Sequence, residues 1–340
     1  MPEPASRPWA RARRRPELWL LLVILIVGAI FAATAPGFLT LPNLIDLLET
    51  YSVQAIIAMG LFVVLVSGGI DISFAATASV AQYCAALVAT RLGLPAPLVI
   101  LAGLGVGVGL GCVNAALIHH LRITSIIATI SMMSVSFSLL MYFSGGRSIY
   151  DLPDWWTGRV VFYRAELASG DIVRVTLPIV VMAAVTLLTW LLMTRASIGR
   201  QLYALGGNPE AARRIGVNVG KLTFFAYGYL GLLAALGGMV QAHRVGESVP
   251  NAMVNTELAV LSAAVLGGAS LTGGIGTVPG VLLGIVLLAM LQNGLNLLGV
   301  SSYFFQIVIG LAILVSTSIT VISSRRGRRR RVLDEAPAHG

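Results

Sequence analysis

The sequence predicts an all-α fold, a polytopic transmembrane helical bundle of about ten spans. Of its 340 residues, 57% are hydrophobic and only 11% are charged, and the mean hydropathy is +0.88. An ordinary soluble domain does not have this composition. Apolar runs of about 20 residues, the length that crosses the hydrocarbon core, recur along the chain. No run resembles strands of alternating polarity, so we expect helices to satisfy the backbone in lipid.

The expected spans divide the chain into one transmembrane domain and two short basic ends. The transmembrane permease domain covers 18–322, between a basic N-terminal segment (1–17) and a basic tail (323–340). The first run follows arginines, as a signal peptide does, but it is long and many spans follow, so we interpret it as a retained helix. In chain order, the expected spans are 18–35, 51–68, 73–90, 95–118, 123–143, 175–193, 222–243, 254–272, 277–298 and 302–322.

The placement of positive charge predicts the orientation. The net charge is +9, and most of the 23 lysines and arginines fall before the first span, in the 194–221 loop or after the last span. By the positive-inside rule, both termini and the 194–221 loop are expected in the cytoplasm, with 144–174 as an external loop. These basic clusters suit anionic membrane lipid, and nucleic acid is not an expected partner.

The 194–221 loop is the most informative segment. Asn208 suits a helix N-cap, Pro209 the first helical position and Gly216 the C′ position, which together predict a helix of about two turns. Such a helix is too short to be stable alone in water. We therefore expect it to pack against the chain and to offer a docking surface to a soluble partner.

The chain lacks the motifs of an enzyme. It has no HExxH, no GxSxG and no phosphate-binding loop, and its single lysine, Lys221, is not in such a setting. ATP hydrolysis would therefore need another subunit, and no cofactor or metal is expected on this chain. His119-His120 is interpreted as a pair of solvated turn residues, and Cys84 and Cys112 as small buried hydrophobes.

Two glycine-rich segments have two open interpretations. Gly68-Gly69 and Gly267-Gly268 interrupt apolar stretches, either as broken helices that line a cavity or as plain turns between spans. Asp71 is expected to cap the next helix, although an intramembrane acid also suits an ion-coupled carrier. For Glu257, structural and gating roles both stay open.

Small and aromatic residues give further packing expectations. Glycines at four-residue spacing predict closely crossed helices: Gly103, Gly107 and Gly111, then Gly276, Gly280 and Gly284. In the external loop, Trp155-Trp156 is expected to lie at the headgroup level as part of an aromatic belt, with contact to an external partner as the alternative.

Five segments together resemble the permease subunits of ATP-binding cassette importers of the ribose/xylose/autoinducer-2 type. The resemblance covers about residues 37–320 and implies a type II importer-like permease in the bacterial cytoplasmic (inner) membrane. It also implies a second permease subunit, two cytoplasmic ATPases that use ATP and Mg, and a periplasmic or lipid-anchored sugar-binding protein. The matching segments are LVSGGIDIS (65–73), ITSIIATISMMS (123–134), IGRQLYALGGNPEAARRIGV (198–217), ELAVLSAAVLGGASLTGGIGTVPG (257–280) and QNGLNLLGVSSY (292–303).

The resemblance places ATPase coupling in the short helix of the 194–221 loop. The expected coupling residues are Gly207, Asn208, Pro209, Glu210, Ala211, Ala212, Arg213 and Arg214. Ala211 and Ala212 are expected to allow a close approach to the ATPase.

Polar residues within spans are candidates for the pathway lining, with interhelical hydrogen bonding as their default role. They are Asn114, Thr129, Ser131, Ser134, Gln292, Asn293 and Asn296. The sequence departs from the family at Phe74-Ala75, Ala259 and 131–138, where side chains shape a pathway, so it does not name the solute. The alternatives are an ion-coupled secondary carrier, a permease for branched-chain amino acids and a non-transporting scaffold.

Overall fold

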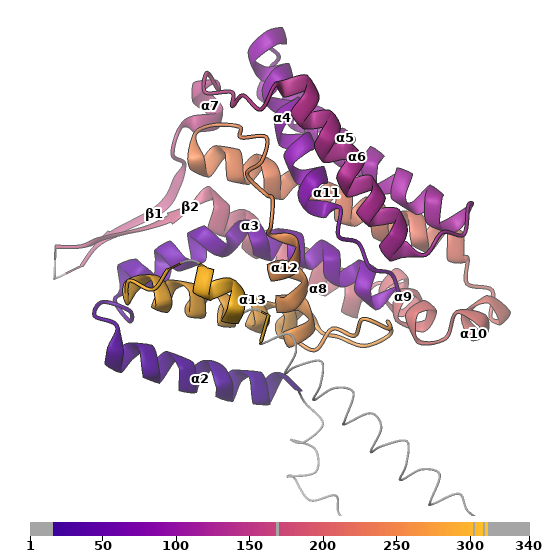
Figure 1. Cartoon of the computed structure of the whole chain (residues 1–340). Coiled ribbons are helices and arrows are strands. Elements are labelled where there is room, and N and C mark those ends of the chain that lie inside the picture. Colours follow the sequence, from indigo (N-terminus) through magenta and orange to yellow (C-terminus); the bar gives the residue numbers. More distant parts are fainter. Residues whose placement is uncertain (1–15, 168–169, 302, 309, 312–340) are drawn as a thin grey trace, which may run out of the picture.

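The computed structural model describes residues 16–311, apart from 168–169, 302 and 309, and it is mainly helical (Figure 1). The expected basic tail, and all but the last residues of the basic N-terminal segment, lie outside the described residues. The elements are α2 (Pro16–Thr34), α3 (Leu41–Val66), α4 (Phe74–Leu92), α5 (Ala96–His119), α6 (Ser125–Ser144), α7 (Asp154–Thr157), β1 (Val161–Glu166), β2 (Ile172–Thr176), α8 (Leu177–Thr194), α9 (Ser197–Gly207), α10 (Pro209–Arg214), α11 (Val219–Val245), α12 (Glu257–Leu266) and α13 (Val278–Leu297).

Seven of the described helices are long and apolar enough to cross a membrane: α2, α3, α5, α6, α8, α11 and α13. The polytopic helical fold is therefore confirmed, while the count of ten spans stays a prediction. Most of the expected last span, 302–322, lies outside the described residues. The expected span 254–272 is not a single helix, because α12 has only 10 residues. Its length of about 15 Å is half the thickness of the hydrocarbon core.

Helices α3 and α11 form the centre of the bundle. In their most apolar windows, 78% of α3 and 72% of α11 are buried, against 17% for α2 and 22% for α5, α6 and α8. Figure 1 shows the strand hairpin at one end of the bundle and α9 and α10 at the other. These two ends are called the hairpin end and the α10 end below.

Four of the six spaced glycines bring chain segments into backbone contact, as predicted, whereas Gly103 meets side chains of Met239 and Ala85. A Cβ on Gly107 would overlap the carbonyl oxygen of Gly231, and one on Gly111 would overlap that of Tyr227, so α5 lies directly against α11. Gly284 of α13 has the same relation to Ala263 of α12, and Gly280 has it to Gly267, which directly follows α12. Gly276 is an exception within its series, since it lies in the loop before α13 with a φ of +146°.

The segment between α6 and α8 differs from the expectation in two ways. Although no strands were expected, β1 and β2 form an antiparallel pair in which Arg164 lies opposite Arg174. Trp156 does not lie in a headgroup belt, because it is buried and its indole N–H donates to the carbonyl of Met239 at 3.1 Å. Trp155, which stacks on Trp156, keeps 40% of its surface exposed.

Both glycine-rich segments are connections between separate helices. Residues 67–73 form a turn between α3 and α4, in which Gly68 has a φ of +89°. Residues 267–277 join α12 to α13, with Gly268 also at a φ of +89°. Left-handed backbone of this kind favours glycine. The segment at Gly68-Gly69 is therefore a turn between two helices, as one of the two interpretations predicted. The segment at Gly267-Gly268 is the start of a long loop that follows the short helix α12.

Candidate coupling surface and polar pockets

Helix α10 has the start and the end that its sequence predicts. The side chain of Asn208 accepts a hydrogen bond from the Ala211 N–H at 3.0 Å, and Pro209 occupies the first turn. At the other end, Gly216 has a φ of +85°, and its N–H donates to the Arg213 carbonyl. The N–H of Val217 donates to the Ala212 carbonyl, which completes a Schellman motif. Local hydrogen bonds thus fix a very short helix at both ends.

The outer face of α10 is accessible and mostly basic. Glu210, Ala211, Arg213 and Arg214 are exposed. Ala212 differs from the expectation, because it is only 2% exposed and packs against its own chain. Of the two alanines, Ala211 alone is available to a partner.

Ile215 is a surface residue that the sequence analysis did not single out. It follows α10 directly, and 76% of its surface is exposed. An apolar side chain beside two arginines is a common composition for a docking surface. In the sequence, the feature that pointed to Ile215 was its position immediately before Gly216, the predicted C′ residue of the helix.

A glycine junction joins α10 to the bundle. We use this name for Gly68, Gly206, Gly273 and Gly274, where three chain segments meet. A Cβ on Gly206 would overlap the Val66 carbonyl oxygen and lie 2.6 Å from the Gly274 nitrogen. The Gly274 N–H donates to the Val66 carbonyl at 2.9 Å. Because these backbones touch without side chains between them, we expect a displacement of the end of α9 to displace the other two segments.

Tyr203 adds a second link between α9 and the 267–277 loop. Its hydroxyl donates to the Gly276 carbonyl at 2.8 Å. Burial raises the pKa of the Tyr203 phenol above its ordinary value, so the hydroxyl keeps the proton that it donates.

A basic pocket lies beside α10. Its volume is about 920 Å³, and it is lined by the end of α5, the following turn, Arg213 of α10, the residues between α10 and α11, and the start of α11. His119, His120, Arg122 and Arg213 are among its lining residues. Both histidine rings lie against Phe224. No group of three or more potential metal ligands occurs in the described part of the chain.

Asp71 belongs to a buried polar cluster between α3 and α4. One carboxylate oxygen accepts from the Ser73 N–H and hydroxyl, both at 2.7 Å, and the other accepts from Asn114 at 3.2 Å. Thr129 hydrogen-bonds the backbone of residues 70 and 72. Asn114 and Thr129 are 1% and 0% exposed. These hydrogen bonds are of the kind expected by default for polar residues within spans.

The other pathway candidates fall in two places. Ser131 and Ser134 lie on an exposed side of α6, where the Ser134 hydroxyl donates to the Ile130 carbonyl. Gln292, Asn293 and Asn296 lie near the end of α13, in a pocket shared with α3. The structure thus does not bring the seven candidates together. Tyr51 and Gln54 of α3 line the pockets in this region as well, and they were missed because they lie within an apolar run.

Two of the α13 candidates already have partners on α3. The amides of Asn293 and Asn43 donate to each other at 3.0 Å in both directions. The Tyr51 hydroxyl donates to Gln292 Oε1. Glu257, left open by the sequence, is partly buried at the start of α12.

Comparison with known proteins places the chain in a family. Residues 43–317 match the model of the permease component of branched-chain amino acid transport systems. The chain belongs to this permease family.

Several proteins with sugar-transport names are similar to this chain over most of their length. The ribose import permease of Escherichia coli (strain K12) is 34% identical over 308 residues, which cover 88% of this chain and 92% of that protein. The ribose import permease of Bacillus subtilis is also 34% identical, over 88% of this chain and 90% of that one. The galactose/methyl galactoside import permease of Haemophilus influenzae is 33% identical, over 88% and 92%.

Proposed function

We propose that this chain is the transmembrane permease subunit of an ATP-driven importer for a monosaccharide or a related small polar solute. The observation that carries the proposal is α10, a capped helix with an accessible basic face whose base is joined to the bundle by the glycine junction. This arrangement suits a surface on which a separate ATPase docks. The sugar assignment rests on the relatives named for ribose and galactose import.

The proposed assembly follows from the relatives, which are named as import permeases. In it, two cytoplasmic ATPase subunits bind ATP with Mg and hydrolyse it, and a periplasmic or lipid-anchored binding protein delivers the solute. A second permease subunit completes the pathway. Following the positive-inside rule, we propose that both termini and α10 lie in the cytoplasm and that the hairpin end lies outside the inner membrane of a bacterium.

The proposed mechanism is alternating access driven through α10. ATP binding brings the two ATPases together and moves the α10 helices with them. The glycine junction passes the displacement to the α3–α4 turn and to the α12–α13 loop. The bundle then opens on the side of the binding protein, and hydrolysis reverses the change. The solute moves because the two states differ in stability with and without ATP.

A pair of charge reversals tests the docking surface. Arg213→Glu with Arg214→Glu changes the sign of the accessible face of α10 while leaving its cap and Schellman motif in place. We expect the ATPase to be lost from the purified complex and ATP-driven sugar uptake into proteoliposomes to stop. Charge pairs across an interface contribute enough to make this a loss of more than about tenfold.

The matched control lies at the other end of the molecule. Arg164→Glu with Arg174→Glu makes the same change of charge on the β1–β2 pair, and we expect the ATPase to stay bound. Retention of the ATPase by the α10 variant would contradict the proposal. Uptake that continues without nucleotide and stops when the ion gradient is removed would favour a secondary carrier instead.

A further inference from the structure

Two adjoining pockets lie near the hairpin end. They are lined by α3, α13, residues 255–260 at the start of α12 and residues that follow α13. Their volumes are about 320 and about 250 Å³, and they share Tyr51, Gln292 and Phe305. Together they have the size of a small-molecule site. Amides and hydroxyls provide most of the other polar lining: Thr50, Gln54, Asn255, Thr256, Asn293, Asn296, Ser301 and Gln306.

The pockets contain a hydrogen-bond donor and a hydrogen-bond acceptor that have no protein partner in the described part of the chain. Because Gln292 accepts from Tyr51 through Oε1, its N–H groups are left without a protein partner in the described part of the chain. Gln54 Oε1 is buried and also lacks a partner there. An unsatisfied buried carbonyl is costly unless a ligand or water donates to it. A hydroxyl both donates and accepts, so it matches one free donor and one free acceptor.

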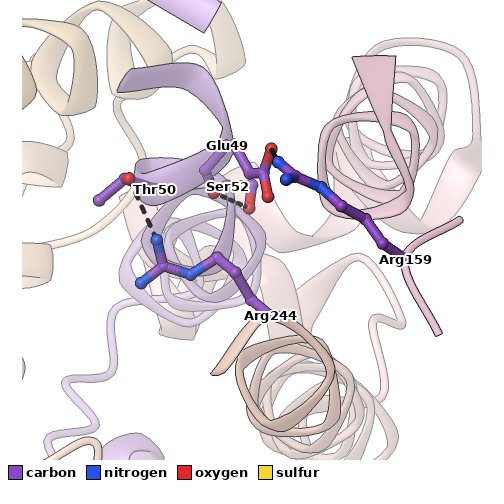
Figure 2. A network of polar contacts seen from close by, with 5 residues as sticks. All are labelled: Glu49, Thr50, Ser52, Arg159 and Arg244. Atoms are coloured by element: carbon purple, nitrogen blue, oxygen red, sulfur yellow. Dashed lines mark hydrogen bonds and ion pairs between the residues drawn. The ribbon is translucent and has the colours of Figure 1, made fainter. Parts of the chain in front are cut away.

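Two arginines near the pockets contact residues of α3 (Figure 2). Arg159 pairs with Glu49 at 3.4 Å, and Arg244 donates to the Thr50 hydroxyl at 3.1 Å. Asp46 is the only residue with a formal charge among those that line the two pockets. A carboxylate in the pockets would therefore find no cationic side chain in their lining. This favours a neutral solute over an amino acid, which would bury an unpaired carboxylate.

We infer that these pockets bind one neutral, polyhydroxylated solute of monosaccharide size. Gln54 and Gln292 hydrogen-bond its hydroxyls, and the aromatic ring of Phe305 offers an apolar surface to its C–H face. The inference rests on the proposed function and deepens it, because it assigns solute contact to α3 and α13. It removes Asn114 and Thr129 from the pathway lining.

Protection of a thiol tests binding directly. In a chain with Cys84 and Cys112 replaced by serine, Asn296→Cys places a thiol at the pocket, and Ser131→Cys places a control thiol on the exposed side of α6. The purified permease in lipid nanodiscs is alkylated with a maleimide in the presence of a panel of pentoses and hexoses, D-ribose and D-galactose included, or of L-leucine. We expect a sugar to slow alkylation several-fold at position 296 and to leave position 131 unchanged. Lack of protection by every sugar, equal protection at both positions, or protection by leucine would each overturn the inference.

Uptake by the full importer provides the second readout. Gln54→Leu and Gln292→Leu each remove one hydrogen-bonding group, and we expect sugar uptake to fall about tenfold while the ATPase still co-purifies. Thr34→Leu, at the exposed end of α2, is the control and should transport normally. Normal uptake by both amide variants would contradict the assignment. If the wild-type chain binds no ATPase but a sugar protects position 296, the proposed coupling is wrong and the assignment of the pockets is supported. If the chain binds the ATPase but no sugar protects position 296, only the assignment of the pockets is wrong.

Discussion

At the scale of single residues, two neighbouring glycines have opposite surroundings. A Cβ on Gly206 would overlap the backbone of Val66 and approach that of Gly274, whereas a Cβ on Gly207 has nothing within 4 Å. Glycine is thus required at the first position by close approach of backbones and is dispensable at the second. The sequence placed Gly207 among the coupling residues and gave Gly206 no separate role, because contacts between distant segments are not visible in the local pattern.

This pair gives a test of the glycine junction. Gly206→Ala must push the three segments apart, and we expect ATP-driven uptake to fall at least about tenfold while the ATPase still co-purifies through the unchanged face of α10. Gly207→Ala makes the same chemical change without a clash and should transport normally. Equal uptake by the two variants would show that the junction does not transmit motion. Both variants are compared in proteoliposomes at matched protein content.

Polar residues show the same limit of sequence reasoning. Asn114 and Gln292 are both amides in apolar runs, and the pattern does not separate them. In the structure Asn114 donates to Asp71 and Ser73 inside the protein, while Gln292 lines a pocket. Burial by distant helices decides which amide is structural, and that burial is fixed only when the bundle forms.

At the scale of elements, the sequence predicts the ends of a helix best where the hydrogen bonds that fix those ends join residues close together in the chain. The ends of α10 follow from Asn208, Pro209 and Gly216 because each acts within a few residues of its own position. The expected span 254–272 was wrong as a single helix because hydropathy does not show where a helix stops. The β1–β2 pair was missed because it lies in a loop between spans, where hydropathy gives no signal for a strand.

Helix α5 offers a second matched pair of glycines. A Cβ on Gly111 would overlap the Tyr227 carbonyl oxygen and lie 2.9 Å from its carbon, whereas one on Gly109 has nothing within 4 Å. We expect Gly111→Ala to lower the stability of the permease by about 1–3 kcal/mol by forcing α5 away from α11. Gly109→Ala should be neutral or slightly stabilising, since alanine favours the helix. Thermal unfolding in the same detergent measures both, and equal midpoints would contradict the packing described for these helices.

At the scale of the whole molecule, the two ends differ in a way that suits a driven permease. The α10 end has an accessible basic helix, the glycine junction and a basic pocket. The hairpin end has amide-lined pockets, near which Arg159 pairs with Glu49 and Arg244 donates to Thr50. Between them, α3 reaches both ends, since Val66 lies at the glycine junction and Tyr51 at the pockets. A displacement of its α10 end is therefore expected to change the pockets.

The central claim is that α10 faces the cytoplasm and carries the ATPase, and labelling of one site tests it most directly. With Cys84 and Cys112 replaced by serine, Ile215→Cys is exposed to a membrane-impermeant maleimide in sealed right-side-out and inverted vesicles. We expect labelling in inverted vesicles alone, and protection when the ATPase is added. Labelling from the outside, or in inverted vesicles without any effect of the ATPase, would contradict the account.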